Sequence, residues 1–226
     1  NGRVSQASLD ARCLKVLRAK AWVGLDQYKP IVLDNLVNDL NSVQDNLLNR
    51  KLTEASLTVL KNDRNLLPLQ RLDTLRIASV AIESDKLTAF QQMAGNYTKI
   101  DHFRLTSQMP DSALAQVRDS LKNYNLLLVD VHLNSISPSA KYGLKAKTAG
   151  LVSELVATGN AVVTVFGNVY ALDKLTFPMD TIQPNRNIEQ ARALVMPSPP
   201  PNYTEGVAAQ LVIGAIGSWG ELPVRR

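Results

Sequence analysis

Cysteine is almost absent from this sequence of 226 residues, in which Cys13 stands alone. A single cysteine excludes an internal disulfide and a zinc site built from several cysteines. Leu9, Leu17 and Ala21 recur with Cys13 at helical spacing. This pattern predicts a small buried side chain at Cys13 rather than a reactive thiol.

Aromatic residues are also scarce, at 5% of the chain. The net charge is +5, but lysines and arginines alternate with aspartates and glutamates along most of the sequence. A nucleic-acid-binding protein normally presents a clustered basic face with aromatic side chains between the cations. We therefore expect no nucleic-acid partner.

The sequence has no run of eighteen apolar residues, which a membrane-spanning helix would need. Its longest apolar segment, residues 207–216, is interrupted by Gln210 and Gly214. No membrane span is therefore expected. The sequence starts at Asn1 and shows no signal-peptide pattern, which fits an excised or processed segment of a longer protein.

Several motifs that mark catalytic or cofactor sites are missing from the sequence. No Gly-x-Gly-x-x-Gly motif follows a predicted strand, so we expect no nucleotide cofactor, and the absence of Gly-x-Ser-x-Gly argues against an α/β-hydrolase. The only two histidines, His102 and His132, have no cysteine or glutamate cluster beside them, so no metal site is expected. The acidic residues are dispersed singly, whereas glycosidases place two carboxyl groups roughly 5 to 9 Å apart across the sugar.

The first third of the chain shows helical spacing of its apolar residues. Helices are predicted over residues 5–25, 34–48 and 52–60, the first with Ser5 as N-cap and Gly24 at its end. Their apolar stripes are narrow and no strand separates them. They cannot form a core alone, so we expect them to pack against the unit that follows and against a further domain.

From Arg76 onward, short β-branched runs alternate with helical stretches, which is typical of parallel βαβ units. Strands such as LLLVDV and AVVTVF are apolar on both faces, as a sheet covered by helices on each side requires. The predicted fold class is α/β, a flavodoxin-like three-layer sandwich with a mostly parallel five-stranded sheet and an N-terminal helical extension. The expected domains are residues 1–75 and 76–226. The predicted strands are residues 77–82, 99–103, 126–131, 161–166 and 193–196, and the helices between them are residues 86–95, 111–121 and 143–156.

The end of the chain is marked by a proline-rich joint, PSPPP at residues 197–201. A last helix is predicted over residues 204–216, ended by Gly217 and Gly220. The LPV sequence at residues 222–224 is predicted to be a closing strand or edge segment.

Three residues are candidates for ligand binding: Asp130, His132 and Asn168. Asp130 and His132 share one face at the end of a predicted strand, and Asn168 follows Gly167 at the end of another. The carboxyl ends of parallel strands are where α/β sheets bind ligands. The alternative is structural, with His132 as a satisfied loop or core residue and Asn168 as the cap of the next segment. No residue is predicted to be catalytic.

Four segments, in sequence order, resemble the second domain of family 3 glycoside hydrolases and the helix that leads into it. LDARCLKVLRAKAWVGLDQY at residues 9–28 resembles the helix leaving the catalytic barrel, and EASLTVLKNDRNLLPL at 54–69 resembles the start of the second domain. VFGNVYAL at 165–172 is similar to the family's Phe-Gly-Asn-Pro-Tyr sequence, with Val169 replacing the proline. GVAAQLVIGAIGSWGELPV at 206–224 resembles the terminal helix and the Gly-x-Leu-Pro-Val ending.

This resemblance implies a non-catalytic C-terminal domain whose partner is a (β/α)8 barrel of the same polypeptide. The family's Asp nucleophile and, in its β-N-acetylglucosaminidase branch, a His-Asp acid/base lie in that barrel, and neither motif occurs here. The implied parent is a β-N-acetylhexosaminidase that hydrolyses O-glycosyl bonds of peptidoglycan-derived sugars in the periplasm or outside the cell. This chain alone is expected to be inactive.

Two further expectations follow from the same resemblance, namely contact with carbohydrate and homodimer formation. The alternative function is a free-standing regulatory module that binds a sugar or muropeptide near His132 and Asn168. Saturable sugar binding would favour that module over a purely structural domain.

Overall fold

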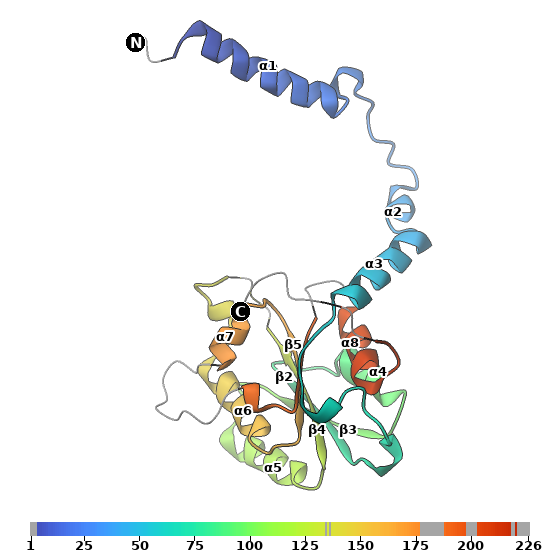
Figure 1. Ribbon diagram of the computed structural model, residues 1–226, viewed down its shortest axis with the longest axis vertical. Helices are drawn as coiled ribbons and strands as arrows, with labels where there is room; N and C mark the ends of the chain where they lie inside the picture. Colours follow the sequence, from blue (N-terminus) through green and yellow to red (C-terminus); the bar gives the residue numbers. More distant parts are fainter. Residues whose placement is uncertain are drawn as a thin grey trace. The chain divides into compact units, whose positions relative to one another are not determined.

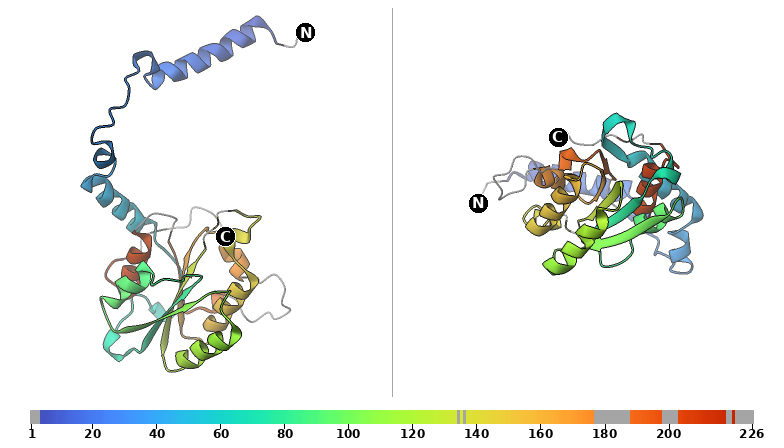
Figure 2. Two further views of the ribbon diagram at one scale, coloured as in Figure 1. Left: turned by 180° about the vertical axis from the view of Figure 1, so that it is seen from behind. Right: turned by 90° about the horizontal axis from the view of Figure 1, so that it is seen from below.

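The structure is a computed structural model that describes residues 4–133, 135, 137–176, 188–197, 203–217 and 220. The chain forms two compact units, Asn1–Asp45 and Asn46–Arg226. Figure 1 shows the elements of both units, and Figure 2 shows them from two further sides.

The first unit contains the predicted N-terminal helix. Helix α1 (Gln6–Trp22) starts at Ser5, whose hydroxyl accepts a hydrogen bond from Ser8 N at 3.2 Å, and the chain leaves it through Gly24 in the left-handed conformation. No residue of α1 is buried, and Cys13 is exposed. The prediction of a buried Cys13 is therefore wrong, because helical spacing identifies an apolar face but not whether that face is covered.

The second predicted helix is interrupted. A short helix α2 (Leu36–Asp39) ends before α3 (Val43–Ser56) begins. Ser42 accepts a hydrogen bond from Asp45 N at 3.2 Å, while Ser42 N donates to the Asp45 carboxylate at 3.1 Å. This reciprocal cap starts a new helix, which explains why the apolar spacing over residues 34–48 does not correspond to one continuous helix.

The second unit is built on a six-stranded sheet with the order β1-β6-β5-β4-β2-β3. All neighbouring strands are parallel except β1, which pairs antiparallel with β6. The α/β class is confirmed, with one strand more than predicted. The strands are β1 (Thr58–Asn62), β2 (Ile77–Ile82), β3 (Ile100–Leu105), β4 (Leu126–His132), β5 (Ala161–Phe166) and β6 (Ala193–Met196).

The additional strand lies where a third helix was predicted. Residues 52–56 continue α3, but Thr58–Asn62 is extended and pairs with β6, with Val59 opposite Val195. Thr58 and Val59 are β-branched and suit a strand, yet the pairing partner lies more than 130 residues away. Local spacing therefore could not reveal this strand.

The helices form two layers, one on each face of the sheet (Figures 1 and 2). Helices α4 (Ala89–Gly95) and α8 (Thr204–Ile213) cover one face, and α5 (Asp111–Leu121), α6 (Ala146–Val156) and α7 (Ala171–Thr176) cover the other. Strand β4 has apolar side chains on both faces: Leu126 and Leu128 face α4 and α8, and Val129 faces the opposite core. The three-layer sandwich is thus confirmed.

Local capping sets several helix ends inside the predicted ranges. Helix α4 begins at Ala89 rather than at residue 86, because Thr88 and Gln91 form a capping box. Helix α8 ends at Ile213, since Gly214 adopts φ 99° and a Cβ there would lie 2.7 Å from Pro68 Cβ. Helix α7 was not predicted. Of the proline-rich joint predicted over residues 197–201 only Pro197 is described, and the segment predicted over residues 222–224 lies outside the described residues. Within the described ranges, no helix combines the length and apolar character needed to cross a bilayer.

Candidate functional site

The sheet has a topological switch point between β2 and β4. From β2 the chain first adds β3 on one side and later adds β4 on the other, so the connections that follow β2 and β4 diverge at their carboxyl ends. Open α/β sheets typically bind ligands at such a point. Asp130 and His132 lie here, at the end of β4.

Asp130 is fully buried, and its carboxylate is shared between several donors. Its Oδ2 accepts a hydrogen bond from Thr88 Oγ1 at 2.9 Å and lies 2.9 Å from His132 Nε2. Ser79 on β2 lies 3.5 Å from Oδ1. Because Thr88 also caps α4, Asp130 fixes the start of that helix against the sheet.

His132 lies between two carboxylates. Its Nε2 faces Asp130, its Nδ1 is 3.6 Å from Glu205 Oε1, and its ring stacks on Phe166 with 5.0 Å between centroids. Glu205 Oε2 also accepts a hydrogen bond from Ala89 N at 2.8 Å. We call these residues the Asp130–His132–Glu205 cluster; it links β4 with α4 and α8.

This cluster has the geometry of a positioning group, because its contacts join β4 to α4 and α8. Both ring nitrogens of His132 face carboxylates rather than a hydroxyl or thiol, so the imidazole is not arranged as the base of a nucleophilic triad. The side chain of His132 is 18% exposed and that of Glu205 is 33% exposed, so solvent reaches the outer end only.

Asn168 stabilises the turn before α7 by accepting hydrogen bonds from the backbone. Its side-chain oxygen accepts a hydrogen bond from Tyr170 N at 3.0 Å, and its carbonyl accepts one from Ala171 N at 2.9 Å. In the described part of the chain, no hydrogen bond joins Asn168 to Asp130 or His132. The structure therefore brings Asp130 and His132 together, while Asn168 makes the capping contacts that its structural interpretation predicted.

His102 lies on β3, and β2 separates it from β4. Burial lowers the pKa of His102 below its ordinary value of 6.5, although the Asp130 and Asp101 carboxylates oppose this shift. Among the described residues, no group of three or more His, Cys, Asp or Glu side chains is arranged to hold a metal ion.

Glu83 forms a second polar cluster at the carboxyl end of β2. It has φ 61°, an uncommon conformation for a residue other than glycine, and its carboxylate accepts hydrogen bonds from Ser107 N at 3.0 Å and from the Thr148 hydroxyl. Burial raises the pKa of Glu83, but the hydrogen bonds from Thr148 and Ser107, together with the Lys145 charge, outweigh burial and lower it below 4.5.

Sequence reasoning missed the partners of Asp130 and His132. Thr88 and Gln91 have the spacing of a capping box, which could have located the start of α4. Glu205 and Phe166 gave no local signal, because they reach His132 from elements 73 and 34 residues away in sequence. The sequence likewise gave no signal for Glu83 as a site residue, because its partners Ser107 and Thr148 lie in two later segments.

Comparison with known proteins gives structural relatives only. No protein-family model matches the sequence, and no curated protein matches it. Among solved structures, a glycoside hydrolase family 3 β-N-acetylglucosaminidase from Paenibacillus sp. str. FPU-7 matches 98% of this chain with a TM-score of 0.63 and 16% identity. A beta-glucoside phosphorylase matches 98% with a TM-score of 0.66 and 14% identity.

A third neighbour is a fungal multi-domain family 3 β-N-acetylglucosaminidase, which matches 100% of this chain with a TM-score of 0.64 and 15% identity. This chain spans 40%, 39% and 24% of the lengths of the three structures, in the order named. These likenesses show that the fold of this chain occurs as part of larger family 3 glycosidase and phosphorylase chains.

Proposed function

We propose that this chain is a supporting α/β domain of a family 3 glycoside hydrolase, joined in one polypeptide to a catalytic (β/α)8 barrel. One observation carries the proposal: the fold likeness extends over 98% of this chain yet covers only 40% of a family 3 β-N-acetylglucosaminidase. The four sequence segments that resemble the second domain of that family, in order, support the same assignment.

Two polar clusters support this role. Asp130 is fully buried and held by Thr88 and His132, so its carboxylate is not available to a glycosidic bond. Glu83 is held by Ser107 and Thr148 in the same way. Hydrolysis by the usual mechanism needs two accessible carboxyl groups on either side of the sugar. The domain's work is then to pack on the barrel and to form one wall of the substrate cleft.

The proposed parent is a β-N-acetylhexosaminidase that acts on peptidoglycan-derived sugars in the periplasm or outside the cell, with homodimer contacts made by this domain. The sequence segments similar to the β-N-acetylglucosaminidase branch support this choice. Two of the neighbours are β-N-acetylglucosaminidases, while a third is a beta-glucoside phosphorylase. The substrate therefore has to be established on the whole polypeptide.

The first test is the reading frame on both sides of this segment in its source gene. We expect an upstream barrel with an aspartate nucleophile and a histidine-containing loop. An upstream start codon without a barrel would contradict the proposal. The second test is activity: the purified chain should not turn over an aryl N-acetylglucosaminide, whereas the polypeptide that includes the barrel should. Turnover by the chain alone would contradict the supporting role.

A further inference from the structure

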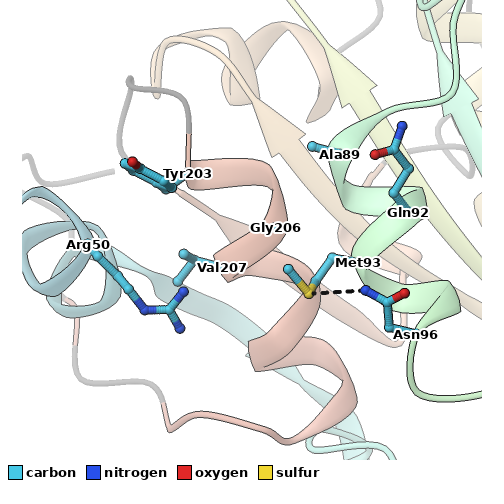
Figure 3. Close-up of a pocket in the computed structure, with 8 residues that line it drawn as sticks. All are labelled: Arg50, Ala89, Gln92, Met93, Asn96, Tyr203, Gly206 and Val207. Atoms are coloured by element: carbon cyan, nitrogen blue, oxygen red, sulfur yellow. Dashed lines mark hydrogen bonds between the residues drawn. The ribbon is translucent and has the colours of Figure 1, made fainter. Parts of the chain in front are cut away.

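A small pocket lies within the second unit between α3, α4 and α8. Its volume is about 220 Å³, and it is lined by Arg50, Ala89, Gln92, Met93, Asn96, Tyr203, Gly206 and Val207. Figure 3 shows Arg50 and Tyr203 on one side of Gly206, with Gln92, Met93 and Asn96 of α4 on the other. None of these residues belongs to the Asp130–His132–Glu205 cluster or to the predicted candidates.

The floor of the pocket is apolar. Val207 is 2% exposed, and Gly206 has no side chain to fill the space next to Met93, whose Cε lies 3.4 Å from where a Cβ of residue 206 would be. Glycine inside a helix lowers helix stability compared with alanine. At Gly206 the missing side chain leaves this space open, although a Cβ there would only just reach contact with Met93.

The rim of the pocket is polar, and part of its hydrogen-bonding capacity is used within the protein. Asn96 Nδ2 donates to Met93 Sδ at 3.9 Å (Figure 3), and the Tyr203 hydroxyl donates to Asn46 Oδ1 at 3.3 Å. Gln92 of α4 and Asn96 at its C-cap present primary amides from exposed positions, and Tyr203, a residue that is 40% exposed, presents an aromatic side chain. An amide offers both donors and an acceptor, which suits a ligand whose groups both donate and accept.

Arg50 supplies donors but little net charge. Its Nε lies 2.9 Å from Glu54 Oε1, and its Nη2 donates to Gln210 Oε1 at 2.7 Å. A guanidinium has five N–H groups, of which these two contacts use two. Because Glu54 already balances the cation and none of the eight lining residues is acidic, the pocket favours a neutral ligand over a charged one.

The two main walls are fixed relative to each other. Glu205, next to Gly206, accepts a hydrogen bond from Ala89 N at 2.8 Å and also faces His132. At the other end, Gln210 donates to the Tyr97 hydroxyl at 3.2 Å. These contacts hold α8 against α4, so a ligand would meet a largely formed site and lose less free energy to ordering it.

We propose that this pocket binds a single neutral pyranose ring, either free or at the end of a longer saccharide. The apolar C–H face of the sugar packs on Tyr203 and Met93, while its hydroxyls exchange hydrogen bonds with Gln92, Asn96 and Arg50. This site goes beyond the proposed supporting function and stands on the pocket alone. It therefore holds whether or not a barrel accompanies the domain.

The test is an NMR titration of the full 226-residue chain, labelled with ¹⁵N, with methyl β-D-glucopyranoside. We expect saturable shifts of the backbone amides of α4 and of the first turn of α8, with a Kd of about 1 mM, as a small polar ligand typically shows. Gln92→Ala and Tyr203→Ala should each weaken binding roughly five-fold, in line with the loss of an aromatic or hydrogen-bonding contact.

Matched control variants can be made away from the pocket, on α5 and just before α7. Gln116→Ala changes an exposed glutamine of α5, and Tyr170→Ala changes an exposed tyrosine before α7, so both should bind like the unmodified chain. Dispersed spectra of all four variants without sugar establish that each one is folded.

Three results would overturn the site: no saturable shift at ten times the expected Kd, the same shifts with glycerol as with the glycoside, or undiminished binding by both pocket variants. Loss of binding in the pocket variants with retention in the controls supports it. Because the measurement uses no barrel and no hydrolysis, its outcome is independent of the test of the supporting function.

Discussion

Asp130 connects three parts of the fold through one buried carboxylate. It receives the hydroxyl of Thr88 at the start of α4, faces His132 two residues along β4 and lies near Ser79 of β2. Removing one partner of a buried polar or charged contact lowers the free energy of unfolding far more than removing one partner of an exposed pair, because the remaining buried group is left unpaired. Residues at this switch point are therefore fixed by polar contacts as well as by apolar packing.

Replacing Asp130 with alanine should lower the free energy of unfolding by about 3 kcal/mol, because Thr88 and His132 would be left without their acceptor. Urea unfolding followed by circular dichroism measures the change. Asp130→Asn keeps the side-chain volume and one acceptor oxygen, so it should lower the free energy of unfolding by less than Asp130→Ala does. Asp119→Asn alters an exposed aspartate and serves as the control. Equal stability of Asp130→Ala and Asp119→Asn would contradict the structural role of the cluster.

Gly167 allows β4 and β5 to approach closely at their carboxyl ends. A Cβ at this position would lie 2.8 Å from Leu133 Cβ, and Leu133 N donates to Phe166 O at 2.8 Å. Gly167→Ala should lower the free energy of unfolding by about 1–3 kcal/mol, since the two backbones would have to separate.

A matched glycine gives the opposite expectation. Gly150 lies within α6, and a Cβ there would meet nothing within 4 Å. Gly150→Ala should raise the free energy of unfolding by about 0.5–1 kcal/mol through better helix propensity. Thermal unfolding of both variants measures the two changes. If both variants shifted the unfolding temperature by a similar amount in the same direction, the close approach at Gly167 would not require glycine.

At the scale of elements, the sequence predicted correctly those strands and helices that have a clear local pattern of apolar residues. The bounds of β2, β5, β6 and α5 agree with the predicted ranges to the residue, because continuous apolar runs and helical spacing are local signals. Strand β1 was mistaken for a helix, since its pairing with β6 depends on a distant partner. The candidate site was predicted in part: Asp130 and His132 share a strand, while Glu205 and Thr88 come from other elements.

Glu83 joins the end of β2 to α6 and to the segment after β3, through Thr148 and Ser107. Its pKa is lowered in the folded state, so its ionised form stabilises the fold above the ordinary value of 4.5, and this contribution is lost as the pH falls below that value. Glu83→Gln should therefore be less stable than the unmodified chain near about pH 7, with the two stabilities converging in acid.

Urea unfolding at a series of pH values measures this convergence. Glu154→Gln is the control, because that side chain is 41% exposed and its ion pair with Arg118 is open to solvent. A constant difference between Glu83→Gln and the unmodified chain at all pH values would mean that the effect comes from shape rather than from ionisation.

At the scale of the whole molecule, truncation measures where the folding unit begins. The sequence pattern predicts a boundary at residues 75/76, which stays a prediction, and the compact unit that contains the sheet is Asn46–Arg226. All buried residues of the two cores lie at or after Leu57. Residues 42–226 include the Ser42 cap of α3 and every core residue, so this fragment should unfold cooperatively.

A fragment of residues 76–226 should fold poorly or not at all. It lacks β1 and three buried leucines, Leu57, Leu67 and Leu69, each of which stabilises the fold by about 1.5–3 kcal/mol. Their sum is comparable with the whole stability of a typical domain, roughly 5–15 kcal/mol. Near-UV circular dichroism and thermal unfolding of the two fragments distinguish the boundaries. Cooperative unfolding of residues 76–226 at the temperature of residues 42–226 would show that β1 is an accessory edge rather than part of the core.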